Sequence, residues 1–370
     1  MIQILSWLHS IVSVAFALGL VIVLHESGHF FACRRLGVRV EKFAFGFGPE
    51  LLGFTDSVGT RFSLCAIPFG GFVKPAGEDP TAADAAEPKS DEYFGQSWNR
   101  RLIIVYAGPA MNYLLAFTIY TGLIWAKGLP EGSKESVIGN MVIGYPADKA
   151  GIEIGDKVTA FGGRALTGWE DLAGSIHRST DKEITLSVER AGKKLDIKVT
   201  PKLDEAGEHG VIGIMPNVIM KPVGFSGAAS EAVSRCWLQS KQTVTAIASK
   251  LWKRERPDLA GPVGIAQMIS RAAKSGFEEF IYLIGFISVA IGFFNLLPLP
   301  LLDGGHAAFY WWEGLRGRRA SNEAMEKANT VGITFLLSLL VFATYNDILR
   351  IRTSRAAKAA KTAAEPELKK

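Results

Sequence analysis

Cysteine and charged residues are both scarce in this sequence, and each shortage excludes a class of protein. The three cysteines, Cys33, Cys65 and Cys236, are an odd number at spacings that match no zinc ribbon and no disulfide framework. Charged residues make up 21% of the 370 residues, whereas 48% are hydrophobic. This composition is too apolar for an ordinary soluble enzyme, and it favours a membrane protein.

A strong net charge of either sign is also missing, because the sequence has 41 basic and 36 acidic residues and a formal net charge of +5. This balance gives no support for a nucleic-acid-binding surface, so no nucleic-acid partner is expected. The small basic excess fits the anionic lipids of a bilayer instead.

Long apolar runs are what the sequence does contain, and about four of them can form membrane helices. A helix of about 20 apolar residues crosses the roughly 30 Å hydrocarbon core of a bilayer. The candidate runs are residues 2–32, 102–126, 280–302 and 331–345, and the last is the shortest. Gly108-Pro109 is expected to interrupt the second run.

The positions of lysine and arginine predict how these helices are oriented. Basic residues follow the first run and precede the second, so the loop between them is expected to be cytosolic and residues 127–275 to lie outside. Four spans also place residues 350–370 outside, although this tail is basic. Either the tail is an exception to the rule, which we favour, or the fourth run does not span.

Between the second and third runs the pattern changes to short alternating stretches that are typical of strands, such as residues 183–189 and 194–199. Residues 145–166, YPADKAGIEIGDKVTAFGGRAL, resemble the PDZ domains of bacterial proteases. A PDZ domain binds an extended chain end along a sheet edge, so a peptide end is the expected partner. The alternative is a generic β-rich insertion.

The first apolar run contains a motif with candidate catalytic residues, His25-Glu26-Ser27-Gly28-His29. Positions i and i+4 share one helix face, so His25 and His29 can direct ring nitrogens at one metal ion while Glu26 reaches its bound water. Ionisable residues inside a membrane helix are costly and mark functional sites. The alternative is a pair of histidines that are hydrogen-bonded to neighbouring helices.

A catalytic zinc ion takes three protein ligands and keeps one position open, so a third donor is required. The candidate is Asp303, at the end of the third apolar run, where prolines break the helix and Gly304-Gly305 allows a sharp turn. His306 and Glu313 are alternative third ligands. Asp303 could instead cap the following helix.

These motifs together resemble the bacterial site-2 proteases, which are intramembrane zinc metalloproteases, and in particular the regulator of sigma-E protease. The resemblance rests on HESGH at residues 25–29, NLLPLPLLDGG at 295–305 and the PDZ-like run between them. Four further motifs match in the same order, namely FGFGP at 45–49, RFSLCAIPFGGFVK at 61–74, AGPAMN at 107–112 and AGPVGIA at 260–266.

The resemblance implies a role for each matched residue. His25, His29 and Asp303 would bind Zn²⁺, Glu26 would be the catalytic acid and base, and Asn295 would hold the substrate backbone. It also implies regulated cleavage of single-pass membrane substrates, such as anti-sigma factors and remnant signal peptides. The location implied is the bacterial inner membrane, with the PDZ domain in the periplasm and the active site near the cytosolic face.

The expected fold is an α-helical integral membrane protein with a membrane-associated β-hairpin and an inserted β-rich PDZ domain. Relatives of the sigma-E type carry two tandem PDZ domains, whereas residues 201–280 are too few for a second one here. The expected segments are an amino-terminal membrane segment (1–126), the PDZ domain (127–205), a linker with an amphipathic helix (206–276), a carboxyl-terminal membrane segment (277–349) and a basic tail (350–370).

Two segments can contact substrate, and for each a plainer interpretation is open. Residues 61–74 are the candidate sheet edge that pairs with an unwound substrate, or else an ordinary cytosolic hairpin. Residues 233–253 form a helix that lies on the outer membrane face or gates the site, or else a packed helix. For the whole chain, the alternatives to a protease are a PDZ-bearing scaffold or inactive relative, and a zinc transporter.

Overall fold

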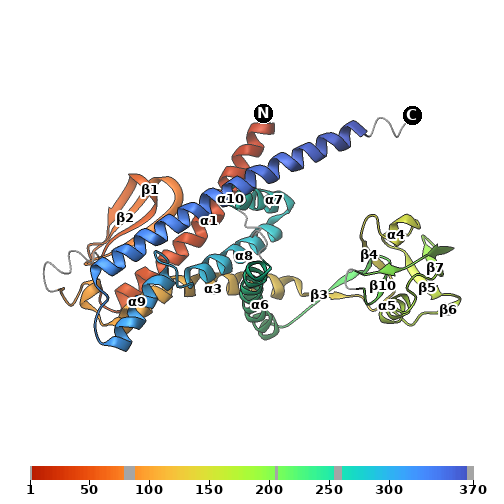
Figure 1. The fold of residues 1–370 in the computed structure, drawn as a ribbon, viewed down its shortest axis with the longest axis horizontal. Helices are drawn as coiled ribbons and strands as arrows, with labels where there is room; N and C mark the ends of the chain where they lie inside the picture. Colours follow the sequence, from red (N-terminus) through yellow and green to blue (C-terminus); the bar gives the residue numbers. More distant parts are fainter. Residues whose placement is uncertain (1, 79–87, 205–206, 254–260, 365–370) are drawn as a thin grey trace. The chain divides into compact units, whose positions relative to one another are not determined.

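The computed structural model describes residues 2–78, 88–204, 207–253 and 261–364, and it divides into two compact units (Figure 1). One unit combines Met1–Leu123 with Phe225–Lys370, and the other is Ile124–Gly224. The first is mainly helical and the second is β-rich.

The helical unit is built from both ends of the chain, so residues far apart in sequence can meet in one site. Its helices are α1 (Ile2–Arg35), α3 (Trp98–Lys127), α6 (Phe225–Trp252), α7 (Pro262–Ser275), α8 (Phe277–Asn295), α9 (Asp303–Arg316) and α10 (Asn322–Ala364). A short 3-10 helix, η1 (Tyr93–Gly95), precedes α3, and a hairpin of β1 (Val40–Thr55) and β2 (Arg61–Pro75) follows α1.

Four of these helices are long and apolar enough to cross a membrane. They contain the candidate spans Ile4–Arg35, Trp98–Lys127, Phe277–Asn295 and Glu323–Thr353. Large apolar side chains such as Ile11, Phe16 and Leu337 are more than half exposed on them, as lipid-facing side chains are. The number of candidate spans therefore agrees with the sequence analysis.

Three details of these helices differ from the expectation. Pro109 does not interrupt α3, because it lies inside a continuous helix. The third helix ends at Asn295 rather than at 302, since the prolines of residues 296–302 turn the chain before α9. The fourth run is not short, because α10 continues to Ala364 through the good helix formers of the basic tail.

The core of the helical unit forms where α1 packs against its neighbours. Ala17 and Val21 of α1 pack with Ile269 of α7 and Ile284 of α8, and all four are fully buried. Nearer the other end of α1, a second buried cluster joins Cys33 to η1, α3 and α9. His25 and His29 of α1 lie between these two clusters, on a part of the helix that is packed on either side of them.

The β1–β2 hairpin folds back on itself beside α1 (Figure 1). Residues 42–45 pair with residues 61–64 on one side and with residues 71–74 on the other. The strand order is therefore 50–55, 61–65, 42–45 and 71–75, which leaves residues 71–75 as an edge strand next to α1.

The β-rich unit has a four-stranded antiparallel sheet with the order β6-β5-β7-β8. Its strands are β5 (Lys157–Phe161), β6 (Arg164–Ala165), β7 (Ile184–Arg190) and β8 (Lys193–Val199), with helices α4 (Pro146–Lys149) and α5 (Trp169–His177). Apolar and polar residues alternate along β7, whose sequence is ITLSVER. Its apolar residues Ile184, Leu186 and Val188 are therefore buried in one core with Leu172 and Ile176 of α5. Residues 145–166, which resemble PDZ domains in sequence, form α4, β5, the Gly162-Gly163 turn and β6 in that order.

The β-rich unit extends beyond the expected end at residue 205. Strands β9 (Lys202–Leu203) and β10 (Gly210–Val211) pair with each other, while β11 (Ile214–Pro216) and β12 (Val218–Lys221) return to pair with β4 (Ile138–Met141) and β3 (Leu129–Gly132). These strands are too short to show a period of two residues, so the sequence assigns them to a linker. The rest of the expected linker forms α6 and α7.

Candidate metal centre

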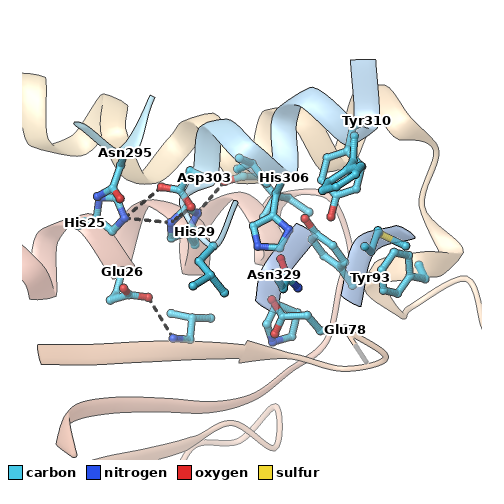
Figure 2. A pocket seen from close by; sticks show the side chains of 18 of the residues that line it. His25, Glu26, His29, Glu78, Tyr93, Asn295, Asp303, His306, Tyr310 and Asn329 are labelled. Carbon is cyan, nitrogen blue, oxygen red and sulfur yellow. Dashed lines mark hydrogen bonds and ion pairs between the residues drawn. The ribbon is translucent and has the colours of Figure 1, made fainter. Parts of the chain in front are cut away.

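Three potential ligands from two distant helices converge in the helical unit. His25 and His29 lie one turn apart on α1, and Asp303 is the first residue of α9. One donor atom from each of the three lies within 4.8 Å of the others, and Figure 2 shows the side chains facing one another. The residues that the sequence predicts as ligands are therefore brought together.

The spacing of these atoms fits a tetrahedral zinc site. Ligands at about 2.0–2.2 Å from a zinc ion lie about 3.3–3.5 Å from one another in a tetrahedron. The two histidine Nε2 atoms are 3.3 Å apart, and they lie 3.2 Å (His25) and 3.5 Å (His29) from the Asp303 carboxylate. Oδ2 of Asp303 is buried and has no hydrogen bond of normal geometry within the described residues. If both ring nitrogens present their lone pairs, a cation between the three groups would offset the repulsion among such close acceptors.

The histidines are held by a close crossing of α1 and α3. A side chain at Gly108 would collide with the rings of His25 and His29, and one at Gly28 would collide with the backbone of α3. Nδ1 of His29 lies 2.8 Å from the carbonyl oxygen of Ile104, a contact in which the ring donates. That tautomer leaves the lone pair of Nε2 free for a metal.

Asp303 reaches the same place because of the turn between α8 and α9. The chain reverses over residues 296–302, and Leu301 adopts a left-handed conformation with φ of 74°. A side chain at Gly304 would meet the backbone of Leu296 and Leu297, so only glycine allows this turn to close. The carboxylate therefore faces α1 from the start of α9, where Leu302 and not Asp303 is the N-cap residue.

Asn112 is a site residue that the sequence analysis did not single out. It is fully buried in α3, and its Nδ2 lies 3.3 Å from Nδ1 of His25 while its Oδ1 has no partner within the described residues. Turning the amide by 180° would let Oδ1 accept a proton from Nδ1 of His25 and would satisfy both groups. A polar residue in the AGPAMN motif of an apolar run was the available signal.

Glu26 lies beside the cluster but is directed at the hairpin (Figure 2). Its Oε2 accepts a hydrogen bond of 3.0 Å from the backbone N–H of Val73, in the edge strand of the hairpin. The carboxylate thus lines the cavity next to His25 and His29 and is held by β2. Sequence spacing placed Glu26 near the metal, and its bond to Val73 is visible only in the folded chain.

A cavity of about 540 Å³ surrounds these groups. Asn295, the last residue of α8, lines it, together with His306, Tyr93 and Tyr310 (Figure 2). Asn295 thus lies in the space where a substrate would meet the metal ligands.

The two alternative third ligands are placed differently from Asp303. His306 lines the cavity but is not part of the group of converging donors. Glu313 forms a bidentate ion pair with Nη2 of the buried Arg101, at 2.6 and 2.7 Å. Its carboxylate is therefore engaged by Arg101, and Asp303 fits the third position best.

Comparison with known proteins now identifies the family. The model of peptidase family M50 matches residues 13–339, which include all four candidate spans in whole or in large part. The chain belongs to peptidase family M50. The resemblance to site-2 proteases is confirmed, and this M50 protein is a metalloprotease whose metal is zinc.

Similar curated proteins support this assignment along almost the whole chain. "Putative zinc metalloprotease mll0638" of Mesorhizobium japonicum is 34% identical over 369 residues, which cover 92% of this chain and 99% of the relative. A protein of the same description from Clostridium acetobutylicum is 32% identical and covers 92% and 97%. One from Campylobacter jejuni is 33% identical and covers 89% and 90%. With four apolar helices, the chain is a bacterial membrane metalloprotease.

Solved structures match a smaller portion of the chain. The PDZ domain of an SdrC-like protein from Listeria innocua is 15% identical, with a TM-score of 0.21, over 22% of this chain and 92% of that one. Its counterpart from Listeria monocytogenes is 18% identical, with a TM-score of 0.20, over 23% and 90%.

Proposed function

We propose that this M50 protease is an intramembrane endopeptidase that cleaves membrane proteins within or beside their transmembrane segments. In this proposal His25, His29 and Asp303 bind the zinc ion, Glu26 is the acid and base, and Asn295 holds the substrate backbone. The observation that carries it is the convergence of the three donors within 4.8 Å, with both histidines on a helix that is apolar enough to span a bilayer.

The residues of the chain have separate tasks in this reaction. A bound zinc ion lowers the pKa of water and polarises the substrate carbonyl. Glu26 takes the proton of the attacking water and returns it to the leaving amine, so no covalent intermediate with the protein is needed. Asn112 and the Ile104 carbonyl orient the two histidines, and Asn295 can bond to the peptide group that is being cut.

A substrate helix must unwind before its peptide bonds are accessible, and its freed N–H and C=O groups then need partners. The edge strand at residues 71–75 can offer them, because its neighbour on one side is residues 42–45 and its other side faces Glu26. The hairpin also exposes Leu51, Leu52 and Phe54 by more than 60%, which fits contact with lipid. These features favour the substrate-edge interpretation over an ordinary hairpin.

The finer details of the proposal concern substrates and location. Single-pass membrane proteins of the anti-sigma type and remnant signal peptides are the proposed substrates, in the inner membrane. The β-rich unit is proposed to be a periplasmic PDZ domain, since an apolar groove between α5 and residues 211–216 could hold a peptide end. The active site would then lie near the cytosolic face.

The test compares the zinc content and the cleavage activity of four detergent-solubilised proteins on a model transmembrane substrate. Wild type should hold about one zinc and cut. Glu26→Gln should keep the metal and lose cleavage, while His29→Ala should lose the metal. His306→Gln is the matched control, because it removes a cavity histidine outside the donor group and should keep the zinc.

Two outcomes would contradict the proposal. Cleavage by Glu26→Gln at the wild-type rate would exclude the role of Glu26 and the proposed reaction. A wild-type protein that binds zinc and the substrate but never cuts would favour the scaffold function instead.

A further inference from the structure

A second hollow lies between the first turns of α1 and the length of α7, apart from the active site. This groove has a volume of about 790 Å³. One wall is formed by α1 through Ser6, Trp7, Ser10, Ile11 and Val14, and the other by α7 through Val263, Ala266, Gln267, Ser270, Arg271 and Lys274. We call it the α1–α7 groove.

The groove is a fixed feature of the fold. The opposite face of α7 is anchored, because Ile269 is fully buried against Ala17 and Val21 of α1. The hydroxyls of Ser10 and Ser270 lie 2.8 Å apart and join the two walls. The hollow therefore remains between two helices that are held together along its length.

The lining of the groove is apolar along one stretch and cationic along another. Ile11, Val14 and Val263 contribute hydrocarbon, whereas Arg271 and Lys274 are one turn apart on α7 and exposed. No acidic residue lines the groove, and within the described residues neither cation forms an ion pair with a carboxylate. The groove thus combines an apolar channel with two positive charges that have no carboxylate partner in the part of the chain that the structure describes.

The level of the groove along α1 matches the edge of a membrane. Trp7 lies near the start of the candidate span Ile4–Arg35 and is 68% exposed, and tryptophan prefers the membrane–water interface. Basic side chains at this level attract anionic headgroups. The neighbouring α7 is amphipathic and is not among the candidate spans, as expected for a helix at the interface.

We propose that the α1–α7 groove binds an anionic phospholipid, with an acyl chain along Ile11, Val14 and Ala266 and the phosphate beside Arg271 and Lys274. The ligand class follows from the charge and from the depth, because a soluble anion would leave the apolar wall uncovered. This site is separate from the proteolytic centre, and it does not depend on the proposed substrates.

The test is native mass spectrometry of the full chain in detergent, titrated with phosphatidylglycerol or with phosphatidylcholine of the same acyl chains. Wild type should bind phosphatidylglycerol more tightly. The double variant Arg271→Gln/Lys274→Gln should lose this preference by a factor on the order of ten, because two basic groups near the headgroup are removed. The control variant Lys193→Gln/Lys194→Gln makes the same charge change in the β-rich unit and should behave like wild type.

A second variant tests whether phosphatidylglycerol binds in the groove itself or is only attracted to the positive charges near it. Ala266→Phe fills the groove and leaves its charge unchanged, so it should also weaken binding of phosphatidylglycerol. Retained zinc content in every variant shows that the fold is intact. Equal binding of the two lipids by wild type, or full binding by Ala266→Phe, would overturn the proposal. So would capture of a model transmembrane peptide in the groove in place of lipid.

Discussion

The tautomer of His25 is the residue-scale feature on which the metal site depends. Nε2 can bind a metal only if the proton is on Nδ1, and Asn112 is the buried group that faces Nδ1. The amide can accept that proton through Oδ1 or donate its own through Nδ2, and the two choices favour opposite tautomers of the neutral ring.

Replacing Asn112 distinguishes these choices. Asn112→Leu should weaken zinc binding by about 10–100-fold, the usual effect of losing such a supporting hydrogen bond. Asn112→Asp should keep most of the affinity, because a carboxylate can only accept the proton from Nδ1. Competition with a chelator measures both. Ser288→Ala is the control, since Ser288 donates to the backbone oxygen of Asn112 and is equally buried. A stronger loss in Asn112→Asp than in Asn112→Leu would refute the acceptor role.

At the residue scale, the sequence predicts which side chains lie together where one helix carries the geometry. His25, Glu26 and His29 could be assigned because their spacing alone puts them on one face. Asp303 could be assigned because a break in an apolar run marks a turn at the right depth. Asn112 and the bond from Val73 to Glu26 were missed because each partner comes from a different element, and a single sequence does not show which elements touch.

At the scale of elements, residues 261–266 of the AGPVGIA motif form the start of α7, where a buried carboxylate of α10 accepts hydrogen bonds. Asp347 is 2% exposed and accepts hydrogen bonds from the backbone N–H groups of Gly261, at 3.2 Å, and Gly264, at 2.8 Å. A carboxylate at a helix N-terminus satisfies free N–H groups and interacts favourably with the helix dipole. Asp347 therefore joins the last membrane helix to α7.

Removing this cap should loosen the helical unit. Asp347→Leu should lower the free energy of unfolding by about 2 kcal/mol, because it leaves two backbone N–H groups at the helix start without an acceptor. The midpoint of thermal unfolding in detergent measures the effect. Glu326→Gln removes an exposed acid from the same helix and should leave the midpoint unchanged. An unchanged midpoint in Asp347→Leu would show that the cap is dispensable.

The β-rich unit contains an ion pair that predicts how its stability depends on pH. Asp156 is 1% exposed and accepts hydrogen bonds from Arg190 at 2.7 and 2.8 Å. Burial raises the pKa of the Asp156 carboxyl, but the bonds from Arg190 and from the N–H of Glu153 bring this pKa below its usual value. A lowered pKa gives stability that is present above the unfolded value of about 3.9 and is lost as the pH falls through the folded value.

Asp156→Asn should therefore destabilise this unit mainly at neutral pH. The expected loss is about 2 kcal/mol, below the range for fully buried pairs because the side chain of Arg190 is 27% exposed. At pH 3 the difference from wild type should shrink. Hydrogen exchange of β7 in the full chain, corrected for the intrinsic rate, measures it at both values. A difference of equal size at pH 3 would contradict the role of this pair.

At the scale of the whole molecule, α7 helps to decide the orientation of the basic tail. It lies against residues 6–14 near the start of α1 and against Ala343 and Asp347 near the end of the candidate span in α10. The amino terminus of α1 and the carboxyl end of that span therefore lie at the same level. Sequence charge alone left this open, because the basic residues of 350–370 argue for the opposite side. We therefore expect the tail to share the side of the amino terminus, away from the loop after α1.

Labelling of single cysteines with a membrane-impermeant maleimide in intact cells tests this topology. The three native cysteines are buried, so they give a low background. Ala360→Cys in the tail and Gly192→Cys in the β7–β8 turn should react from outside. Val58 lies at the tip of the β1–β2 hairpin and is 61% exposed. Val58→Cys should react only after the membrane is permeabilised. If Ala360→Cys and Val58→Cys behaved alike while Gly192→Cys reacted outside, α10 would not cross the membrane, and the basic tail would follow the positive-inside rule rather than the packing of α7.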